Sequence, residues 1–139
     1  DIGYVYRAIM PPRTKSCFTI HTAYTGSFTV LLFQPVSYSR TTEATVNLPM
    51  SGISMQPDLV GGLTLSGQIR NIRNTTIEST RAIAAFYNNK GKVTGCEVAF
   101  ANTGNSNNTL FPNQTGTFAI EASISPASVA NYILQSDYE

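Results

Sequence analysis

The sequence predicts an all-β protein built as a β-sandwich, and three observations support this class. Helical periodicity is almost absent along the 139 residues. The chain consists instead of short runs rich in β-branched and aromatic residues. These runs are separated by Gly, Pro, Asn and Ser, which are the residues that form turns. Many short strands with turn signals between them are typical of two packed antiparallel sheets.

The expected strands follow one another along the whole chain. We place them near residues 2–10, 16–23, 27–39, 43–49, 62–72, 80–88, 92–102, 116–124 and 130–136. Pro35 breaks or bulges the third of these strands, because proline has no N–H to donate within a central ladder.

The clearest pair of strands is the hairpin IAAFYNNKGKVTGCEVAF. Alternation places Ala82, Ala84 and Phe86 on one face of its first strand. Gly91 in the connecting turn can adopt the left-handed conformation that closes such a loop. In the second strand, Cys96 shares a face with its alternate neighbours. We expect this face to be the core side and Cys96 to be buried.

Three segments carry a resemblance to a known family. The first is SGQIRN at residues 66–71, which is similar to an opening strand of the pattern G-x-V-x-N. The second is AAFYNNKGKV at residues 84–93, which is similar to a central hairpin FYD-x-x-G-K-V. The third is LFPNQTGTF at residues 110–118, which is similar to a turn L-x-P-G-E-x-x-x-F. Together they make residues 63–139 resemble the FxLYD family.

This resemblance implies an immunoglobulin-like β-sandwich of about seven to nine antiparallel strands. The family is a packing and interaction module common in secreted prokaryotic proteins, so the resemblance concerns fold and not chemistry. Two positions depart from its pattern. Asn113 stands where the family usually has Gly, and Gln114 stands where it usually has Glu. The first 60 residues lie outside the resemblance.

A second resemblance concerns organisation alone. The chain is similar to archaeal thread-type filament subunits in its apolar N-terminal strand, its low charge and its Asn/Thr-rich loops. Those subunits are secreted, glycosylated sandwiches in which the N-terminal strand of one subunit completes the next. No residue-by-residue match supports this likeness.

The composition favours an exterior location and excludes a nucleic-acid site. Charged residues make up 12% of the chain, against about 25% in typical soluble domains. The net charge is +1, and the Lys and Arg residues are scattered singly, so there is no basic surface for nucleic acid. A surface of neutral polar groups suits an exposed exterior, although a low-charge β protein of any location has the same composition.

No apolar run reaches the roughly 18 residues that a membrane helix needs, so we expect no membrane span in the mature chain. The chain opens at Asp1 without an initiator Met. We interpret this start as that of an extracellular, cell-surface protein whose signal peptide has been removed. A fragment left by tag cleavage would begin in the same way.

Two cysteines, Cys17 and Cys96, are separated by 78 residues and show no metal-ligand spacing. In an oxidising compartment they would form a disulfide that closes a long loop. Two separately buried thiols are the alternative, because free cysteine is commonly buried.

We predict no catalytic residue, no metal site and no cofactor, and therefore no enzyme. His21 is the single histidine, and nothing in the sequence predicts a catalytic partner for it. The acidic residues are dispersed, without metal-loop spacing. The segment 60–62 lacks the Lys and Ser/Thr of a phosphate loop. We interpret Gly61 and Gly62 as a flexible join between the front and the back of the chain.

The pattern N-x-S/T for N-linked glycans occurs at Asn74, Asn107 and Asn113. In a chain so rich in Ser, Thr and Asn, two or three such patterns arise by chance. Their placement is more informative, because all three fall in predicted loops or turns. We expect N-linked glycans at these positions if the protein is secreted.

The N-terminal stretch DIGYVYRAIMPP is the most informative segment for function. A lone strand is not stable, so it must pair with a sheet. We predict that residues 1–12 are a donor strand and proline hinge, and that residues 13–139 form a single sandwich. The strand face that enters the neighbour is expected to consist of Ile2, Tyr4, Tyr6, Ala8 and Met10.

Two functions follow from the two ways in which this strand can pair. If it is donated to a neighbour, the chain is the subunit of an extracellular, pilus-like filament in which copies of itself join head to tail. If it pairs within its own sandwich, the chain is a monomeric, secreted, immunoglobulin-like interaction or adhesion module of a cell-surface protein.

Overall fold

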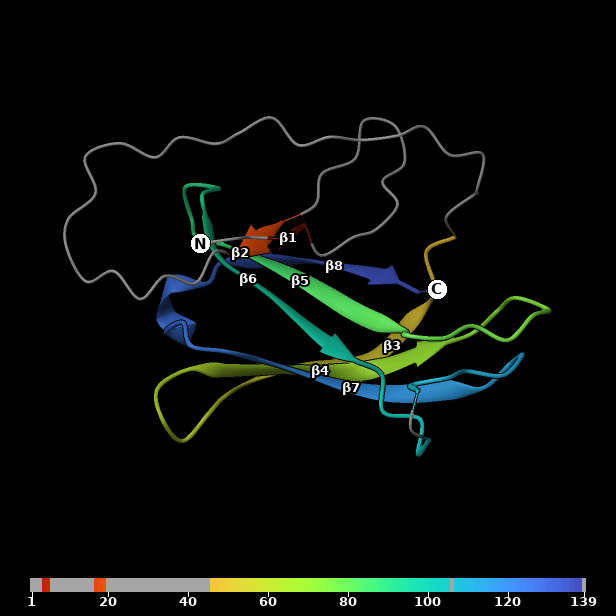
Figure 1. The fold of residues 1–139 in the computed structure, drawn as a ribbon. Helices are drawn as coiled ribbons and strands as arrows, with labels where there is room; N and C mark the ends of the chain where they lie inside the picture. Colours follow the sequence, from red (N-terminus) through yellow and green to blue (C-terminus); the bar gives the residue numbers. More distant parts are fainter. Residues whose placement is uncertain (1–3, 6–16, 20–45, 106, 139) are drawn as a thin grey trace.

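A computed structural model describes residues 4–5, 17–19, 46–105 and 107–138, and only the backbone of residues 4, 5, 18 and 19. The protein is all-β over these residues, which contain no α-helix. Two antiparallel three-stranded sheets lie one above the other in a sandwich-like arrangement, and a separate two-stranded pair lies outside them (Figure 1).

The first sheet has the strand order β3-β4-β7. Its strands are β3 (Met50–Pro57), β4 (Leu63–Arg70) and β7 (Thr115–Ala122). β4 pairs with β7 along its whole length. β7 alternates strictly between exposed and buried residues, as expected for a strand with one face on the core and the other in solvent.

The second sheet has the strand order β6-β5-β8. Its strands are β5 (Arg81–Tyr87), β6 (Val93–Phe100) and β8 (Asn131–Asp137). A single 3₁₀ turn, η1 (Pro126–Ser128), lies in the connection between β7 and β8. β5 is the central strand, and its inner five residues are all buried. β5 is therefore buried on its outer face as well as on the face that lies toward the first sheet.

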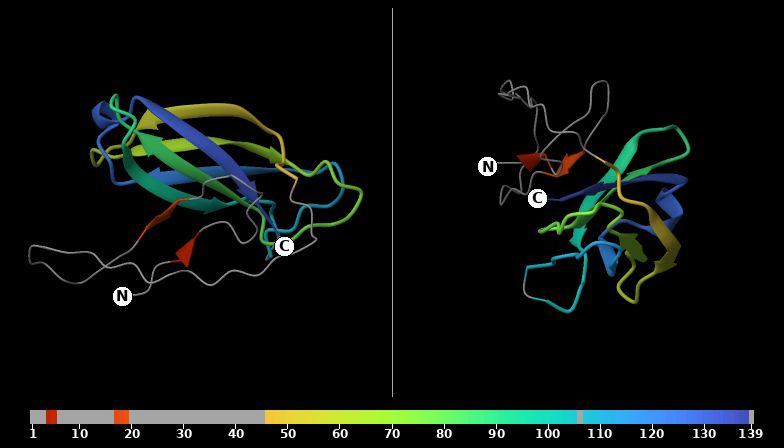
Figure 2. Two further views of the ribbon diagram at one scale, coloured as in Figure 1. Left: turned by 90° about the horizontal axis from the view of Figure 1, so that it is seen from above. Right: turned by 90° about the vertical axis from the view of Figure 1, so that its right-hand side faces the viewer.

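The two-stranded pair consists of β1 (Tyr4–Val5) and β2 (Phe18–Thr19). β1 runs antiparallel to β2, with Tyr4 opposite Thr19. Two views show this pair on the side of the second sheet that faces away from the first (Figure 2). β2 lies against β6, the edge strand of the second sheet.

The core lies between the two sheets and is built from aliphatic side chains and two phenylalanines. Its buried members are Leu48, Leu63, Leu65, Ile69, Ile77, Ala82, Ala84, Phe86, Ala101, Leu110, Phe118, Ile120 and Ala122. The inner face of β5 supplies Ala82, Ala84 and Phe86 to it, as the alternation predicts.

The strand expected at 43–49 is wrong in its described part, because residues 46–49 are not a strand. The strand that the sequence analysis missed is β3, which begins at Met50. Its pairing with β4 contains an irregularity between Ser51 and Ser54, and Gly52 within it has a φ of +61°. Gly52 and Pro57 are poor strand formers, so they weaken the strand signal in the sequence. A bulge and a terminal proline are nevertheless both normal on an edge strand.

The expected strand at 27–39, with Pro35, lies outside the described residues, as does His21. The face assigned to β6 is wrong. Cys96 is buried, but it lies opposite Ala85 and not opposite a core residue of β5. Cys96 therefore faces outward from the sandwich, where it is bonded to Cys17.

Candidate interaction surfaces

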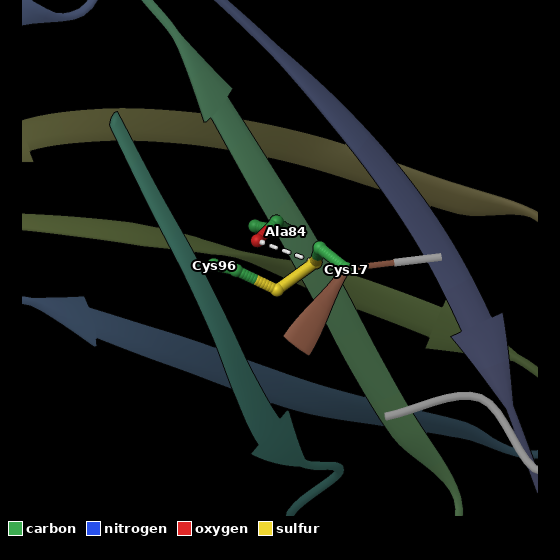
Figure 3. Close-up of a disulfide and its surroundings, with 3 residues drawn as sticks. All are labelled: Cys17, Ala84 and Cys96. Atoms are coloured by element: carbon green, nitrogen blue, oxygen red, sulfur yellow. Dashed lines mark hydrogen bonds between the residues drawn. A yellow bond between two sulfur atoms is a disulfide. The ribbon is translucent and has the colours of Figure 1, made fainter. Parts of the chain in front are cut away.

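The first candidate surface is the place where the N-terminal part of the chain attaches to the sandwich. A disulfide joins Cys17, which immediately precedes β2, to Cys96 in the middle of β6. The two Cα atoms are 5.8 Å apart. The Cys17 sulfur also lies 3.7 Å from the carbonyl oxygen of Ala84 on β5 (Figure 3). The bond thus fixes one point of the N-terminal region to the outer face of the second sheet.

The outer face of the second sheet is apolar around this point. Ile83 lies opposite Val98, and Ala85 lies opposite Cys96. Ile83 is only 1% exposed, although it is not part of the core between the two sheets. This contrasts with β7, whose outward residues are exposed. The outer side of the second sheet is therefore buried along β5 but not at Ile133 of β8, which lies opposite Ala85 and is 48% exposed. Cys17 is the described residue that is bonded to this face.

The predicted donor strand is described only in part. Tyr4 lies in β1, whereas Ile2, Tyr6, Ala8 and Met10 lie outside the described residues. Neither β1 nor β2 is hydrogen-bonded into the two three-stranded sheets. A two-stranded pair of this length is marginally stable by itself. The N-terminal strand is thus paired within its own chain, but outside the hydrogen-bonded ladders of the sandwich.

The second candidate surface is one end of the sandwich, which we name the loop end. It consists of the β4–β5 loop (residues 71–80) and the β6–β7 loop (residues 101–114, described except at 106). The two loops are joined by an antiparallel bridge between Ile77 and Leu110. Both backbone hydrogen bonds of this bridge form, at 3.1 and 2.9 Å. The two loops therefore act as one structural unit.

Asn71 lies at the centre of this unit and is completely buried. Its side-chain amide donates to the carbonyl oxygens of Thr75 and Leu110, both at 2.9 Å. Its side-chain oxygen accepts from the backbone N–H of Arg73, also at 2.9 Å. Its backbone exchanges hydrogen bonds with the β6–β7 loop, accepting from Asn113 and donating to Gln114. Every polar group of this buried residue is satisfied, which a stable loop requires.

All three predicted glycan acceptors lie at the loop end. Asn74, Asn107 and Asn113 are exposed, on the two loops just described. Asn113 has a φ of +65°, a left-handed conformation that glycine adopts most easily and that asparagine tolerates better than most residues. Its side-chain oxygen accepts a hydrogen bond from Arg70 at 3.3 Å. Glycosylation at these positions stays a prediction.

The β3–β4 turn at the opposite end is a feature that the sequence analysis misinterpreted. Gly61 and Gly62 are not a flexible join. They close a tight turn in which the Asp58 carboxylate accepts from the N–H groups of Val60 and Gly62, at 2.9 and 2.7 Å. The backbone N–H of Asp58 donates to the Gly62 carbonyl oxygen, and Gly61 has a φ of +91°. Asp-x-x-Gly-Gly between two strands is the sequence signal that could have identified this turn.

This turn presents two aliphatic side chains to solvent. Leu59 is fully exposed and Val60 is 92% exposed. We name these two residues the tip. Large apolar residues are also exposed at the loop end, where Ile72 is 51% and Phe111 is 58% exposed. Single exposed apolar residues are normal, but two adjacent ones on a rigid turn mark a candidate contact surface.

The described residues offer no group of three or more His, Cys, Asp and Glu side chains that could hold a metal ion. Within the same part of the chain, no helix is long and apolar enough to cross a membrane. Arg81 and Asp137 form an ion pair, with a shortest distance of 2.6 Å. This pair links β5 to β8 and has a structural role.

Comparisons with known protein families, with curated proteins and with solved structures found no match to this chain.

Proposed function

We propose that the chain is the structural subunit of an extracellular, glycosylated, pilus-like filament, in which copies join head to tail by strand donation. In this proposal the β1 segment of one copy pairs with β2 of the next copy. The fold is then an immunoglobulin-like sandwich that is completed by a neighbour. The filament has the organisation of the archaeal thread-type subunits that the sequence resembles.

The observation that carries this proposal is the position of β1. Among the described residues it pairs with the two-residue strand β2 and with no other strand, and that pair stands outside both sheets of the sandwich. Exchanging β1 between copies therefore breaks no ladder of the two three-stranded sheets. The same strand pair can form between two copies as within one, which is the condition for a domain swap.

The disulfide supports the same proposal in a second way. Because Cys17 is bonded to Cys96, the acceptor strand β2 stays attached to the body of its own subunit. Cys17 and Cys96 are the two cysteines of the sequence. The donated segment of this proposal, residues 1–12, lies entirely before the bonded Cys17.

The exterior location is supported by the chemistry of the chain. Disulfides form and persist in oxidising compartments, and the glycan acceptors Asn74, Asn107 and Asn113 are all exposed. The low charge is compatible with an exposed surface made of neutral polar groups.

A specific observation favours a second function. β1 is paired with β2 of the same chain, with Tyr4 opposite Thr19. A chain that keeps this pairing would be a monomeric, secreted interaction or adhesion module. The two functions differ in whether copies associate, which can be measured without knowing any ligand.

The test is negative-stain electron microscopy and sedimentation of the full chain and of a chain that lacks residues 1–10. The proposal expects filaments from the full chain and monomers from the truncated chain. The control is the circular dichroism of the truncated chain, which should keep its β-sheet signal. Filaments of the truncated chain would disprove strand donation, and a full chain that is monomeric under all conditions would support the second function.

A further inference from the structure

The tip and the loop end lie at opposite ends of one strand. Leu59 and Val60 precede β4, and Ile72 follows it. An eight-residue strand is about 26 Å long, so one copy presents these two apolar surfaces at its two ends. Figure 1 shows the β3–β4 turn and the β4–β5 loop at opposite ends of β4.

Hydrogen bonds hold the backbone at both surfaces. The tip is fixed by the hydrogen bonds that the Asp58 carboxylate accepts within its turn. At the loop end, Ile72 follows Asn71, whose side chain is hydrogen-bonded to Leu110 beside Phe111. The two exposed side chains Ile72 and Phe111 therefore extend from neighbouring points of one unit.

The charges beside the two surfaces have opposite signs. At the end of the first sheet that carries the tip, Asp58 lies in the turn and Glu121 is exposed on β7, opposite Thr64. At the loop end, Arg70 and Arg73 lie on either side of Ile72 in the sequence, and Glu78 is exposed farther along the same loop. Glu121 and Arg70 both point outward from the first sheet, since their strand neighbours are buried in the core. Lys90 and Lys92 also lie at the tip's end of the molecule, but on the turn of the other sheet.

We infer that copies of this chain contact each other end to end, with the tip of one copy seated on the Ile72 and Phe111 side chains of the next. The contact is heterologous, because each copy uses two different surfaces, and such contacts produce open chains rather than closed dimers. Glu121 of one copy then faces Arg70 of the neighbouring copy. This inference rests on the proposed function, and it adds a surface that does not involve the N-terminal strand.

Sugars attached to the glycan acceptors are the alternative occupant of the loop end. Asn74 and Asn113 lie near Ile72 and Phe111 in the chain. If sugars cover the two apolar side chains, the loop end is closed to the tip. The charge complementarity favours the second copy, because a neutral sugar gives no reason for arginines around Ile72.

The first test uses two double variants of the full chain. Leu59→Ser with Val60→Thr removes the tip, and Ile72→Thr with Phe111→Ser removes its acceptor. Burying these apolar side chains would stabilise the contact between copies. We therefore expect each double variant to raise the protein concentration needed for assembly by about tenfold or more. Val93→Thr and Ile133→Thr are the controls, because these residues are also about half exposed but belong to neither surface.

Mixing the two double variants tests the direction of the contact. Each variant keeps the surface that the other has lost, so an equimolar mixture should form one-to-one pairs. Sedimentation should detect these pairs at a concentration at which each variant alone is monomeric. If the mixture contains only monomers there, the contact between tip and loop end is disproved.

A charge exchange provides the second test. Glu121→Lys or Arg70→Glu alone should weaken assembly, and both substitutions in the same chain should restore it. Restoration within one copy is excluded by distance, because the two residues are separated by the six positions from Thr64 to Arg70, or about 20 Å. Failure of the double variant to recover would overturn the pairing of Glu121 with Arg70.

The outcomes separate this inference from the proposed function. Loss of assembly in the tip variant together with filaments of the chain lacking residues 1–10 supports the end-to-end contact and disproves strand donation. If the tip variant forms filaments as well as the wild type does, the contact is disproved and strand donation is unaffected. A wild-type chain that never associates disproves both. If removal of the glycans makes the protein aggregate whether or not the tip is substituted, sugar is the cover of the loop end and the inference is wrong.

Discussion

The side-chain amide of Asn71 donates a 2.9 Å hydrogen bond to the carbonyl oxygen of Leu110, which is 39 residues away in the sequence. This bond connects the end of β4 to the loop that leads into β7. Both groups are buried, so water cannot replace either partner. This side chain and the bridge between Ile77 and Leu110 together hold the two loops of the loop end in place.

Asn71→Ala should lower the free energy of unfolding by about 2–3 kcal/mol, because it removes all three hydrogen bonds that this buried side chain makes with the loop backbone. The measurement is urea unfolding followed by circular dichroism. Asn105→Ala is a matched control. Asn105 makes two similar hydrogen bonds to the backbone of Thr109, but it is exposed, so its removal should cost no more than about 0.5 kcal/mol. Equal losses in the two variants would contradict the central role of Asn71.

Gly67→Ala should destabilise the protein by about 1–3 kcal/mol through overpacking of the core. An added Cβ would lie 2.5 Å from the Cδ1 atom of Ile53 and 2.9 Å from the Cζ atom of Phe118. Thermal unfolding of the variant measures the effect. Ser66→Ala, at the neighbouring position of β4, is the control and should change stability by about 0.5 kcal/mol or less. If Gly67→Ala unfolds at the wild-type temperature, the packing of Phe118 against β4 is not as described.

Reducing the Cys17–Cys96 disulfide should lower the free energy of unfolding by about 2–4 kcal/mol, since the bond closes a loop with a sequence separation of 79. Urea unfolding with and without a thiol reductant measures this change. The double variant Cys17→Ser with Cys96→Ala should resemble the reduced protein and should not respond to the reductant. Identical curves for the oxidised and reduced wild type would show that the bond contributes nothing to stability.

Glycosylation should add one glycan mass at each of Asn74, Asn107 and Asn113 when the protein is secreted by its natural host. The substitutions Thr76→Val, Thr109→Val and Thr115→Val each remove one acceptor pattern and leave the asparagine in place. Intact-mass spectrometry should then show the loss of one glycan per substitution. A secreted protein of unmodified mass would contradict all three sites.

The strands from β4 to β8 could be predicted from the sequence because their signals are local. Alternation over residues 115–122 and the hairpin around Gly91 need no information from elsewhere in the chain. The prediction failed at β3, where Gly52 and Pro57 suppress the strand signal and pairing with β4 overrides it. The likeness of residues 63–139 to the FxLYD family was not tested by the comparisons and stays a prediction.

The candidate surfaces were harder to predict because they depend on long-range contacts. The sequence predicts a turn at Asn113, but it does not predict the hydrogen bond that the Asn113 N–H donates to the buried Asn71. It shows that Cys96 alternates with apolar residues, but not which side of the sheet is covered. It shows Leu59 and Val60 beside two glycines, but not that the turn is rigid and fully exposed. These three facts come from tertiary packing.

The disulfide has a mechanical consequence for a chain that is pulled at its ends. All residues between Cys17 and Cys96 lie inside a covalent ring, so a stretching force cannot lengthen them while the bond is intact. Only the residues before Cys17 and after Cys96 can be extended by the force. The ring includes β3, β4 and β5, and therefore the inner strands of both sheets. In a filament of such subunits, stretching could extend residues 1–16 and 97–139, and the disulfide would then stop any further extension of that subunit.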